Sequence, residues 1–217
     1  MIDYLLAGGT GLVGSEIIRQ LLNSTETSSV ICLGRRPIDL ADKRLQNVSY
    51  DFTGQMKITA KPKNPVAICT LGTTIKQAGS EEAFRKVDFD FVMDFGRQAE
   101  DLGALSLHVV TAHGAAKDSM IFYNRVKGEI ETALRALRIP AIHIYRPSLL
   151  IGNRAEHRAG EGFATAAAKV LSPLFRLPGL NAVKPTPADH LAAFILQTAK
   201  KTETGYFIHS NAEIMGV

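Results

Sequence analysis

Tyr123 and Lys127 are the residues of this 217-residue sequence whose types and spacing most directly suggest chemistry. They stand four positions apart on a predicted helix, so their side chains would share one face and lie within reach of each other. A tyrosine hydroxyl ordinarily has a pKa near 10, and a neighbouring ammonium favours the phenolate. The pair is therefore suited to exchanging a proton with a carbonyl or alcohol oxygen.

A glycine-rich turn near the start of the chain predicts a phosphate site. Glycines recur every third residue between an apolar run at 4–7 and a helix expected to begin near residue 12. The first glycine allows a tight turn, the second lets the backbone approach a pyrophosphate, and the third lets the helix pack on the strand. Strand, turn and helix together predict dinucleotide binding at the helix N-terminus, against the alternative of a plain turn without ligand. The expected contact residues are Gly8, Thr10, Gly11, Leu12, Val13 and Gly14.

Arg35 and Arg36 follow the second predicted strand, about 20 residues past the glycine turn, where such a fold carries its cofactor-specificity residue. An acidic residue there would hydrogen-bond the ribose 2′-hydroxyl of NAD(H). Guanidinium groups instead pair well with a 2′-phosphate. The sequence therefore favours NADP(H) over NAD(H). The alternative is that one or both arginines are solvated turn residues.

Further cofactor contacts are expected where other strands end, because ligands of open α/β sheets lie outside the carboxyl ends of the strands. Asp51 and Phe52 close the third predicted strand, at the place of the adenine edge. The small-residue turn after the fourth strand should border the cofactor, and the end of the sixth should lie beside nicotinamide and substrate. These turns contribute Leu71, Gly72, Thr73, Arg146 and Pro147.

The elements that must position these residues alternate between apolar strands and amphipathic helices. Strands are predicted at 4–7, 28–33, 46–51, 66–71, 105–110, 141–146 and 205–209, and long helices at 80–102, 118–138 and 188–199. This order predicts an α/β protein with a Rossmann-type, doubly wound, mostly parallel sheet and helices on both faces. We expect one domain over 1–217, with a small substrate-covering portion within about 152–217. An Ala-rich helix at 163–175 would cover the substrate pocket or be a plain core helix.

The predicted helix at 80–102 is apolar on more than one side, with Phe89 and Met93 lying off its main apolar stripe. A helix of this kind is usually buried on more than one side. One face would cover the sheet. The second face predicts a homodimer, unless other parts of the same chain cover it.

Composition limits the remaining possibilities. The net charge is +4, and no basic cluster is large enough to indicate nucleic-acid binding. Cys32 and Cys69 lie in apolar runs and read as buried thiols, without the spacing of a disulfide framework or metal site. The chain opens on a strand, and no apolar stretch is long enough to span a bilayer. We therefore expect a cytoplasmic protein without a membrane span.

Taken together, these motifs resemble the short-chain dehydrogenase/reductase superfamily in its atypical or extended branch. The glycine turn, Tyr123 with Lys127, and the Arg146-Pro147-Ser148 run carry the resemblance. Two further motifs resemble those of small oxidoreductases of the Tat-interacting-protein type. They are the Leu71–Thr74 turn and the Tyr-x-x-x-Lys-Gly-Glu run ending at Glu129. The resemblance implies that Tyr123 is the acid/base, and that Lys127 holds the nicotinamide ribose and tunes the tyrosine.

The family's third catalytic group is a serine or threonine just after the fifth strand, and here the sequence departs from the pattern. Ala112 stands where the hydroxyl is most expected, Thr111 lies one position earlier, and His113 follows. Thr111 is therefore the candidate, with His113 as a possible donor and a turn-capping role as the alternative for Thr111.

The sequence thus predicts an NADP(H)-dependent oxidoreductase acting on a small carbonyl or alcohol substrate. Two other functions stay open. One is an NADPH-binding regulatory or scaffold protein with little catalysis, which the imperfect catalytic turn allows. The other is an enzyme resembling nucleotide-sugar epimerases, although little sequence follows residue 152 to build a nucleotide-sugar site.

Overall fold

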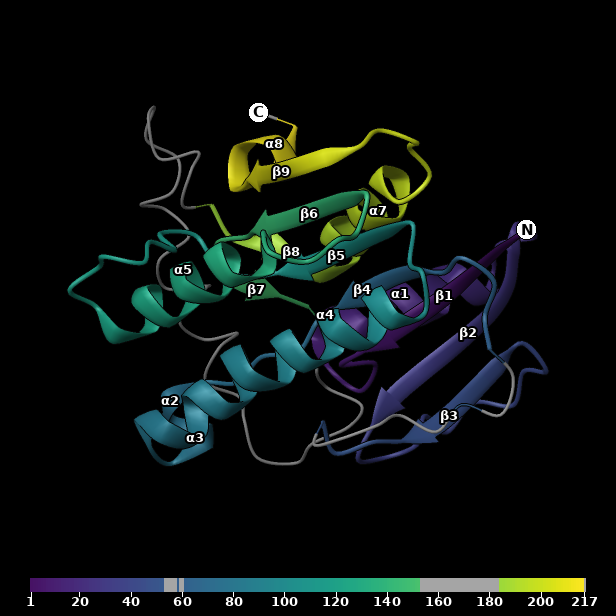
Figure 1. Cartoon of the computed structure of the whole chain (residues 1–217), viewed down its shortest axis with the longest axis horizontal. Helices are drawn as coiled ribbons and strands as arrows, with labels where there is room; N and C mark the ends of the chain where they lie inside the picture. Colours follow the sequence, from purple (N-terminus) through teal and green to yellow (C-terminus); the bar gives the residue numbers. More distant parts are fainter. Residues whose placement is uncertain (53–57, 59–60, 153–183, 217) are drawn as a thin grey trace.

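The computed structural model describes residues 1–52, 58, 61–152 and 184–216. In this part of the chain a parallel seven-stranded sheet runs in the order β3-β2-β1-β4-β5-β6-β9 (Figure 1). The strand order reverses beside β1, as in a doubly wound sheet. The predicted Rossmann-type fold is therefore confirmed. The strands are β1 (Ile2–Ala7), β2 (Thr27–Gly34), β3 (Leu45–Ser49), β4 (Val66–Cys69), β5 (Ser106–Val110), β6 (Ala141–Arg146) and β9 (Gly205–Ser210).

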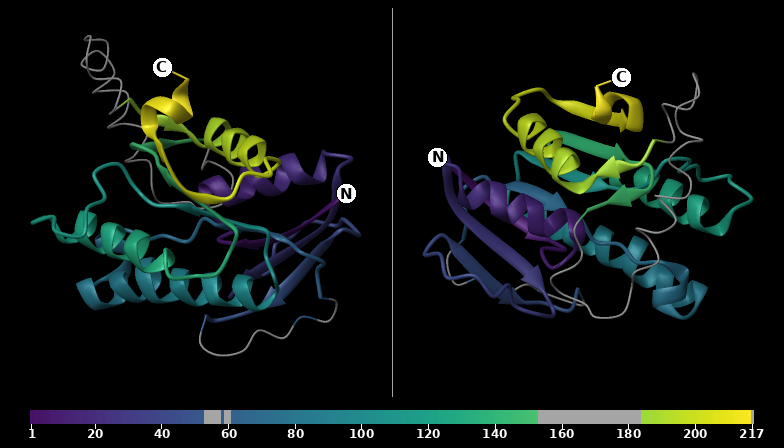
Figure 2. Two further views of the ribbon diagram at one scale, coloured as in Figure 1. Left: turned by 45° about the horizontal axis from the view of Figure 1, so that its top comes forward. Right: turned by 180° about the vertical axis from the view of Figure 1, so that it is seen from behind.

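Helices cover both faces of the sheet (Figure 2). One face carries α1 (Leu12–Leu22) and α7 (Ala188–Thr198), and the other carries α4 (Phe91–Asp101) and α5 (Phe122–Leu134). The central strands β4 and β5 are buried throughout, as expected for a parallel sheet covered on both sides. The shorter elements include α2 (Ile75–Ala78), α3 (Glu81–Arg85), α8 (Asn211–Met215), β7 (Leu150–Ile151) and β8 (Thr186–Pro187).

Side-chain alternation along β1 divides the core into two apolar layers. Leu5 and Ala7 face the layer that holds α4 and α5, whereas Tyr4 and Leu6 face the layer under α1 and α7. Because both layers meet the strands of one sheet, the loops at the strand ends are fixed relative to one another. Those loops carry the predicted site residues.

The helix predicted at 80–102 is interrupted in the structure. It begins as expected, with the Ser80 hydroxyl accepting a hydrogen bond from the Ala83 N–H, and ends before Gly103, whose φ is 69°. Between α3 and α4, however, η1 (Lys86–Asp90) is a π-helical turn, closed by the hydrogen bond that the Phe91 N–H donates to Lys86 O. Single π-helical turns often occur at functional sites. This one carries a buried aspartate.

The second apolar face of this helix is partly covered by the same chain. Phe89 and Met93 pack against the core layer of α4 and α5. The Arg85 guanidinium also lies 4.4 Å from the centre of the Phe89 ring. Residues of the same chain therefore bury part of the apolar face that a partner subunit was expected to bury. The homodimer stays a prediction.

Three buried histidines form a row across β5, β6 and β9. The ring centres of His108 and His143 are 4.7 Å apart, and those of His143 and His209 are 5.4 Å apart. His108 Nδ1 lies 2.8 Å from Tyr145 Oη, and His209 Nδ1 lies 2.7 Å from Glu213 Oε1. Burial and the neighbouring histidines lower the pKa of His143 to about 4 and that of His108 well below its usual value. Both are therefore neutral at neutral pH.

The short strands β7 and β8 pair in parallel and are tied to the start of α8. The Thr186 hydroxyl lies 2.5 Å from Asn211 Oδ1, and the Ser148 N–H lies 3.1 Å from both oxygens. Asn211 Nδ2 also donates to Lys184 O over 2.9 Å. The predicted helix at 163–175 lies outside the described residues, as does the rest of 153–183 in the proposed substrate-covering portion.

Candidate active site

The glycine turn forms a tight backbone cradle between β1 and α1. Gly8 has a φ of 86°, and a Cβ there would come within 2.7 Å of the Thr70 carbonyl at the end of β4. A Cβ on Gly14 would come 2.2 Å from Gly8 O, so only glycine lets the helix approach this closely. The Gly11 N–H donates a hydrogen bond to Gly8 O over 2.9 Å. Each predicted glycine therefore stands at a point where the backbone is crowded or turned.

The first turn of α1 is shaped to receive an anion. Its N-cap is Gly11, which has no side chain to accept hydrogen bonds from the first turn. The leading N–H groups of a helix have no carbonyl partner within the helix, and the helix dipole places partial positive charge there. No acidic side chain lies in this first turn. Leu12, Val13 and Gly14 thus present their N–H groups where the sequence predicts a pyrophosphate.

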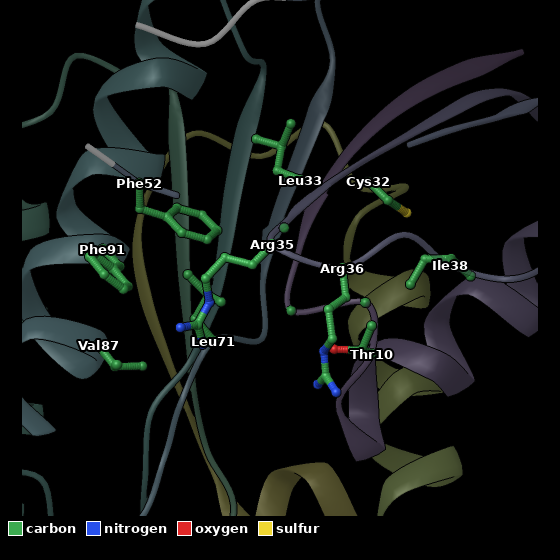
Figure 3. Close-up of a pocket in the computed structure, with 13 residues that line it drawn as sticks. Thr10, Cys32, Leu33, Arg35, Arg36, Ile38, Phe52, Leu71, Val87 and Phe91 are labelled. Atoms are coloured by element: carbon green, nitrogen blue, oxygen red, sulfur yellow. The ribbon is translucent and has the colours of Figure 1, made fainter. Parts of the chain in front are cut away.

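A pocket extends from the glycine turn across the ends of β1 and β2 (Figure 3). Figure 3 shows the Arg35 guanidinium on the side of Leu71, and the Arg36 guanidinium on the side of Thr10. Both arginines are exposed, and within the described ranges neither forms an ion pair. The structure therefore brings together residues that the sequence placed in one cofactor site. The pocket is lined by Gly8, Gly9, Thr10, Cys32, Leu33, Gly34, Arg35, Arg36, Ile38, Phe52, Leu71, Val87 and Phe91.

Phe52 forms an apolar wall of this pocket. Its ring stacks on Phe91, with the ring centres 5.3 Å apart, and meets Tyr50 edge to face. Its φ of 60° is rare for a bulky residue and keeps the ring turned into the core. Asp51, the neighbouring candidate, is exposed and is not among the lining residues. Phe52 is thus the one of this predicted pair that lies at the pocket.

Lys127 is buried and paired with an acid that the sequence analysis did not select. Its Nζ lies 2.7 Å from Oδ1 of Asp88 in the π-helical turn, and the two side chains are 5% and 1% exposed. Asp88 Oδ2 accepts a hydrogen bond from the Thr73 N–H over 2.9 Å. Gly72 lies against the pair, since a Cβ there would be 3.5 Å from Asp88 Oδ1 and 3.7 Å from Lys127 Nζ. The turn after β4 and the lysine of α5 therefore meet at one carboxylate.

Tyr123 lies one helical turn before Lys127 on α5 and is half-buried. Its ring packs against that of Phe84, with the centres 5.4 Å apart. Burial alone would lower the pKa of Lys127, but the Asp88 carboxylate and the nearby Tyr123 phenol raise it above its usual value. Lys127 therefore stays an ammonium beside the tyrosine.

Thr111 and Arg146 are both bound to a second buried acid, Glu131. The Thr111 hydroxyl donates to Glu131 Oε1 over 2.7 Å. Arg146 donates from Nε to Oε1 over 3.1 Å and from Nη2 to Oε2 over 2.5 Å. Arg146 lines a separate hollow between α5 and β9 rather than the pocket at the glycine turn. The structure thus gives these two candidates a shared partner that the sequence analysis did not select.

The turn after β5 offers few other donors. Ala112 is buried and has no hydroxyl. His113 is exposed, and its N–H donates to the carbonyl of Pro147 over 2.8 Å. Pro147 therefore joins the ends of β5 and β6. The role of Thr111 in catalysis stays a prediction.

Sequence reasoning missed Asp88 although a signal was present. Asp88 stands four residues after Phe84 and three before Phe91, so it interrupts an otherwise apolar helical stripe. A charged side chain on such a stripe is rarely buried without a partner. Glu131 gives a similar signal, because it lies four residues after Lys127 and directly follows Ile130 of the buried face of α5.

The chain is similar to curated proteins over nearly its whole length. It is 31% identical over 218 residues to "Protein FMP52, mitochondrial" from Meyerozyma guilliermondii, covering 97% of this chain and 92% of that protein. It is 29% identical over 166 residues to "Protein HTATIP2" from Rattus norvegicus, covering 75% of this chain and 68% of that protein. No family model matches the chain.

These relatives correct the expected location. FMP52 proteins from several fungi are named mitochondrial, so the prediction of a cytoplasmic protein is wrong. That prediction rested on the expectation of a chain without a membrane span, and such an expectation does not specify a compartment. Within the described ranges, none of the helices combines the length and apolar character needed to cross a bilayer.

Solved structures share the fold at low identity. UDP-glucose 4-epimerase from Thermotoga maritima, solved with UDP-glucose, superposes with a TM-score of 0.69 at 12% identity, covering 96% of this chain and 77% of the enzyme. The Bordetella bronchiseptica enzyme WbmG, in complex with NAD and UDP, gives 0.66 at 16% identity, covering 95% and 72%. Fold, glycine turn and relatives agree: the chain belongs to the extended short-chain dehydrogenases/reductases, in the HTATIP2-like family that includes the FMP52 proteins.

Proposed function

We propose that this protein is an NADP(H)-dependent oxidoreductase that transfers hydride to or from a small carbonyl or alcohol substrate. One observation carries the proposal: the stretch 70–72 touches both halves of the site. The Thr70 hydroxyl donates to Gly8 O over 3.2 Å, Leu71 lines the pocket, and Gly72 lies against Lys127. A cofactor that starts at the glycine turn would therefore extend towards Lys127 and Tyr123.

The residues present fit a phosphorylated dinucleotide. The cradle at Gly8 and Gly14 has no room for a Cβ, and the bare N-terminus of α1 suits a pyrophosphate. Arg35 and Arg36 would supply charge-assisted hydrogen bonds to a 2′-phosphate. The phenyl ring of Phe52 would lie against the adenine. Because the described residues that line the pocket include two arginines and no acid, we propose NADP(H) rather than NAD(H).

The chain's own residues would handle the proton. When bound, the nicotinamide supplies or accepts the hydride. In reduction Tyr123 would donate its hydroxyl proton to the carbonyl oxygen, and in oxidation the phenolate would take a proton from the alcohol. The Lys127 ammonium favours that phenolate and would bind the ribose. We also propose that the portion after residue 152 contributes to the substrate site.

A second function is favoured by one observation. The Thr111 hydroxyl is already bound to Glu131, and Ala112 has no hydroxyl to orient a reacting oxygen. We therefore keep an NADPH-binding regulatory protein with slow turnover as the alternative. In that case cofactor binding would be normal and hydride transfer would be weak.

Two measurements separate these functions. NADPH should raise the melting temperature in both cases, because a ligand that binds only the folded state stabilises it. An enzyme should also oxidise NADPH with members of a panel of aldehydes, ketones and quinones, and Tyr123→Phe should abolish that turnover. Tyr206→Phe, which removes a phenol from the other flank of α5, is the matched control. No NADPH-induced stabilisation would reject the proposal, and stabilisation without turnover would favour the regulatory alternative.

A further inference from the structure

A second hollow lies between α5 and β9, the strand at one edge of the sheet. Its volume is about 190 Å³, which suits a small ion rather than a drug-sized ligand. Its walls come from the loop after β5, from α5, from the end of β6 and from β9. Among the described residues it shares no lining residue with the pocket at the glycine turn. It is therefore a separate candidate for ligand binding.

The hollow carries more positive than negative charge. Three cationic side chains line it, those of Lys117, Arg135 and Arg146. The one acid among the described lining residues is Glu131, which is buried and already bound by Arg146 and the Thr111 hydroxyl. Lys117 and Arg135 are exposed, and within the described ranges neither forms an ion pair. The hollow thus holds two cations that lack a counter-ion in the described part of the chain.

Arg135 is held in place by an aromatic ring. Its guanidinium carbon lies 3.8 Å from the centre of the Tyr206 ring, which is a cation–π contact. The Tyr206 hydroxyl donates to the backbone oxygen of Glu131 over 2.7 Å and fixes the ring beside α5. A guanidinium that stacks on a ring keeps the N–H groups at its edge for hydrogen bonds. Arg135 therefore offers a planar set of donors that is already oriented.

Arg146 also has a donor to spare. It uses Nε and Nη2 on the two oxygens of Glu131. Its Nη1 group forms no hydrogen bond with the described residues. The Arg146 side chain is 30% exposed, whereas that of Glu131 is 5% exposed. The ion pair thus holds the guanidinium firmly and leaves Nη1 for a further acceptor.

Lys117 reaches the hollow from a loop that is fixed against α5. A Cβ on Gly128 would come within 2.2 Å of the carbonyl carbon of Ala116 and of the Lys117 nitrogen, so only glycine lets the backbone lie this close. The Ala116 N–H also donates to Asn124 O over 3.1 Å. Ile208 of β9 adds an apolar wall on the opposite side. The three cations therefore stand on rigid parts of the fold.

We propose that this hollow binds the oxyanion group of a small molecule, a carboxylate or a phosphate, through Lys117, Arg135 and Arg146. Guanidinium groups match such anions with pairs of N–H donors, and a lysine adds a point charge. Binding there requires neither the cofactor nor the hydride transfer proposed above. Arg146 and Glu131 connect the hollow to the Thr111 hydroxyl at the end of β5. A bound anion would thus lie next to a hydrogen-bond network that reaches the candidate catalytic threonine.

The test titrates the full-length ¹⁵N-labelled protein, without cofactor, with sodium phosphate or sodium succinate at constant ionic strength. The backbone amide signals of Lys117, Gly128, Arg135 and Ile208 should shift together and saturate, with one dissociation constant in the millimolar range or below. Signals of residues 11–14 are fitted separately, because phosphate could also bind at the glycine turn. The probe that binds more tightly shows whether a phosphate or a carboxylate is the preferred group.

Variants of the exposed cations show whether the hollow itself holds the anion. Arg135→Gln should weaken binding at least tenfold, because it removes charged hydrogen bonds. Arg135→Lys keeps the charge but loses the planar donors, and should weaken binding severalfold. Arg138→Gln is the matched control: it removes an exposed arginine three residues further along, outside the hollow, and should leave the dissociation constant unchanged.

Two results would overturn the site. One is a shift that rises linearly over the whole titration for both probes, and the other is an equal loss of affinity in Arg135→Gln and Arg138→Gln. Both would indicate general attraction of anions to a basic surface. If Arg135→Gln does not fold, Lys117→Gln decides, and unchanged affinity in that variant overturns the site. Because no cofactor is present, the titration decides this site even if the protein does not bind NADPH.

Discussion

Thr111 donates its hydroxyl hydrogen to Glu131, with Oγ1 2.7 Å from Oε1. Both residues are buried, and Arg146 donates to both oxygens of the same carboxylate. The hydroxyl that resemblance to the family puts forward for catalysis is therefore held by a structural acid. This contact decides what should happen when the hydroxyl is removed.

Thr111→Val should lower the free energy of unfolding by about 1–2 kcal/mol, because Glu131 loses a buried donor. Thr111→Ser keeps the hydroxyl and should stay close to wild type. Urea denaturation measures the free energy of unfolding, and kcat per folded molecule measures the contribution of the Thr111 hydroxyl to catalysis. If the hydroxyl is mainly structural, kcat should change less than tenfold in Thr111→Val. A hundredfold loss of kcat at unchanged stability would show instead that Thr111 acts on the substrate.

Gly14→Ala should destabilise the protein by about 2–3 kcal/mol, because the added Cβ meets the backbone and overpacking has costs of this size. The contact would be with Gly8 O at 2.2 Å, where no flexible side chain can give way. Gly34→Ala is the control, since its Cβ would meet nothing closer than 3.7 Å. Chemical denaturation of both variants checks this. Equal stability of the two would contradict the close packing of α1 on the glycine turn.

The double variant Arg35→Ala/Arg36→Ala should lose its preference for NADPH over NADH. Charged hydrogen bonds of about 1.5–3 kcal/mol correspond to roughly ten- to hundredfold weaker NADPH binding. NADH, which has no 2′-phosphate, should bind nearly as before. Calorimetry with both cofactors measures the ratio, and Arg138→Ala, an exposed arginine beyond the C-terminal end of α5, serves as control. An unchanged ratio would rule out these arginines as the specificity residues.

Acid should destabilise the protein through the buried histidines His108 and His143. The pKa values of His108 and His143 are lowered in the fold by burial and by neighbouring histidines, the latter to about 4. Unfolded histidines titrate near pH 6.5. The stabilisation is therefore complete above pH 6.5 and is lost as the pH falls from 6.5 towards 4. Each histidine adds a slope of up to about 1.4 kcal/mol per pH unit.

Urea denaturation at intervals from pH 7 to 4.5 measures that slope. His143→Phe keeps a ring between His108 and Phe207 and should reduce the loss of unfolding free energy per pH unit below pH 6.5. His190→Gln removes an exposed histidine and should leave it unchanged. Stability that stays level between pH 7 and 5 would contradict the neutral state of His108 and His143.

The fold was largely predictable because its signals are local. The run 66–69 is apolar throughout, as buried parallel strands often are, and glycine spacing predicted the β1–α1 turn. The π-helical turn was not predictable, because Phe84, Val87 and Phe91 also fit a regular α-helix. The short strands β7 and β8 were missed as well, since two-residue strands carry no periodic pattern.

The cofactor end of the site was more predictable than its catalytic end. Thr10, Arg35, Arg36, Phe52 and Leu71 all line one pocket, because each follows the end of a strand in the same sheet. Lys127 and Arg146 instead find their partners through tertiary packing. Asp88 precedes Lys127 by 39 residues, and no spacing rule connects two different helices. Buried charge pairs of this kind require the fold before they can be recognised.

The pairing of β7 with β8 holds residues 150–151 next to residues 186–187. Hydrogen bonds among Ser148, Thr186 and Asn211 add to this connection between two stretches that are far apart in the sequence. Lengthening a closed loop has only a logarithmic entropy cost, about 0.6 kcal/mol per doubling. Because β7 and β8 are paired with each other, segments of other lengths could be grafted between residues 152 and 184 while the seven-stranded sheet stays unchanged.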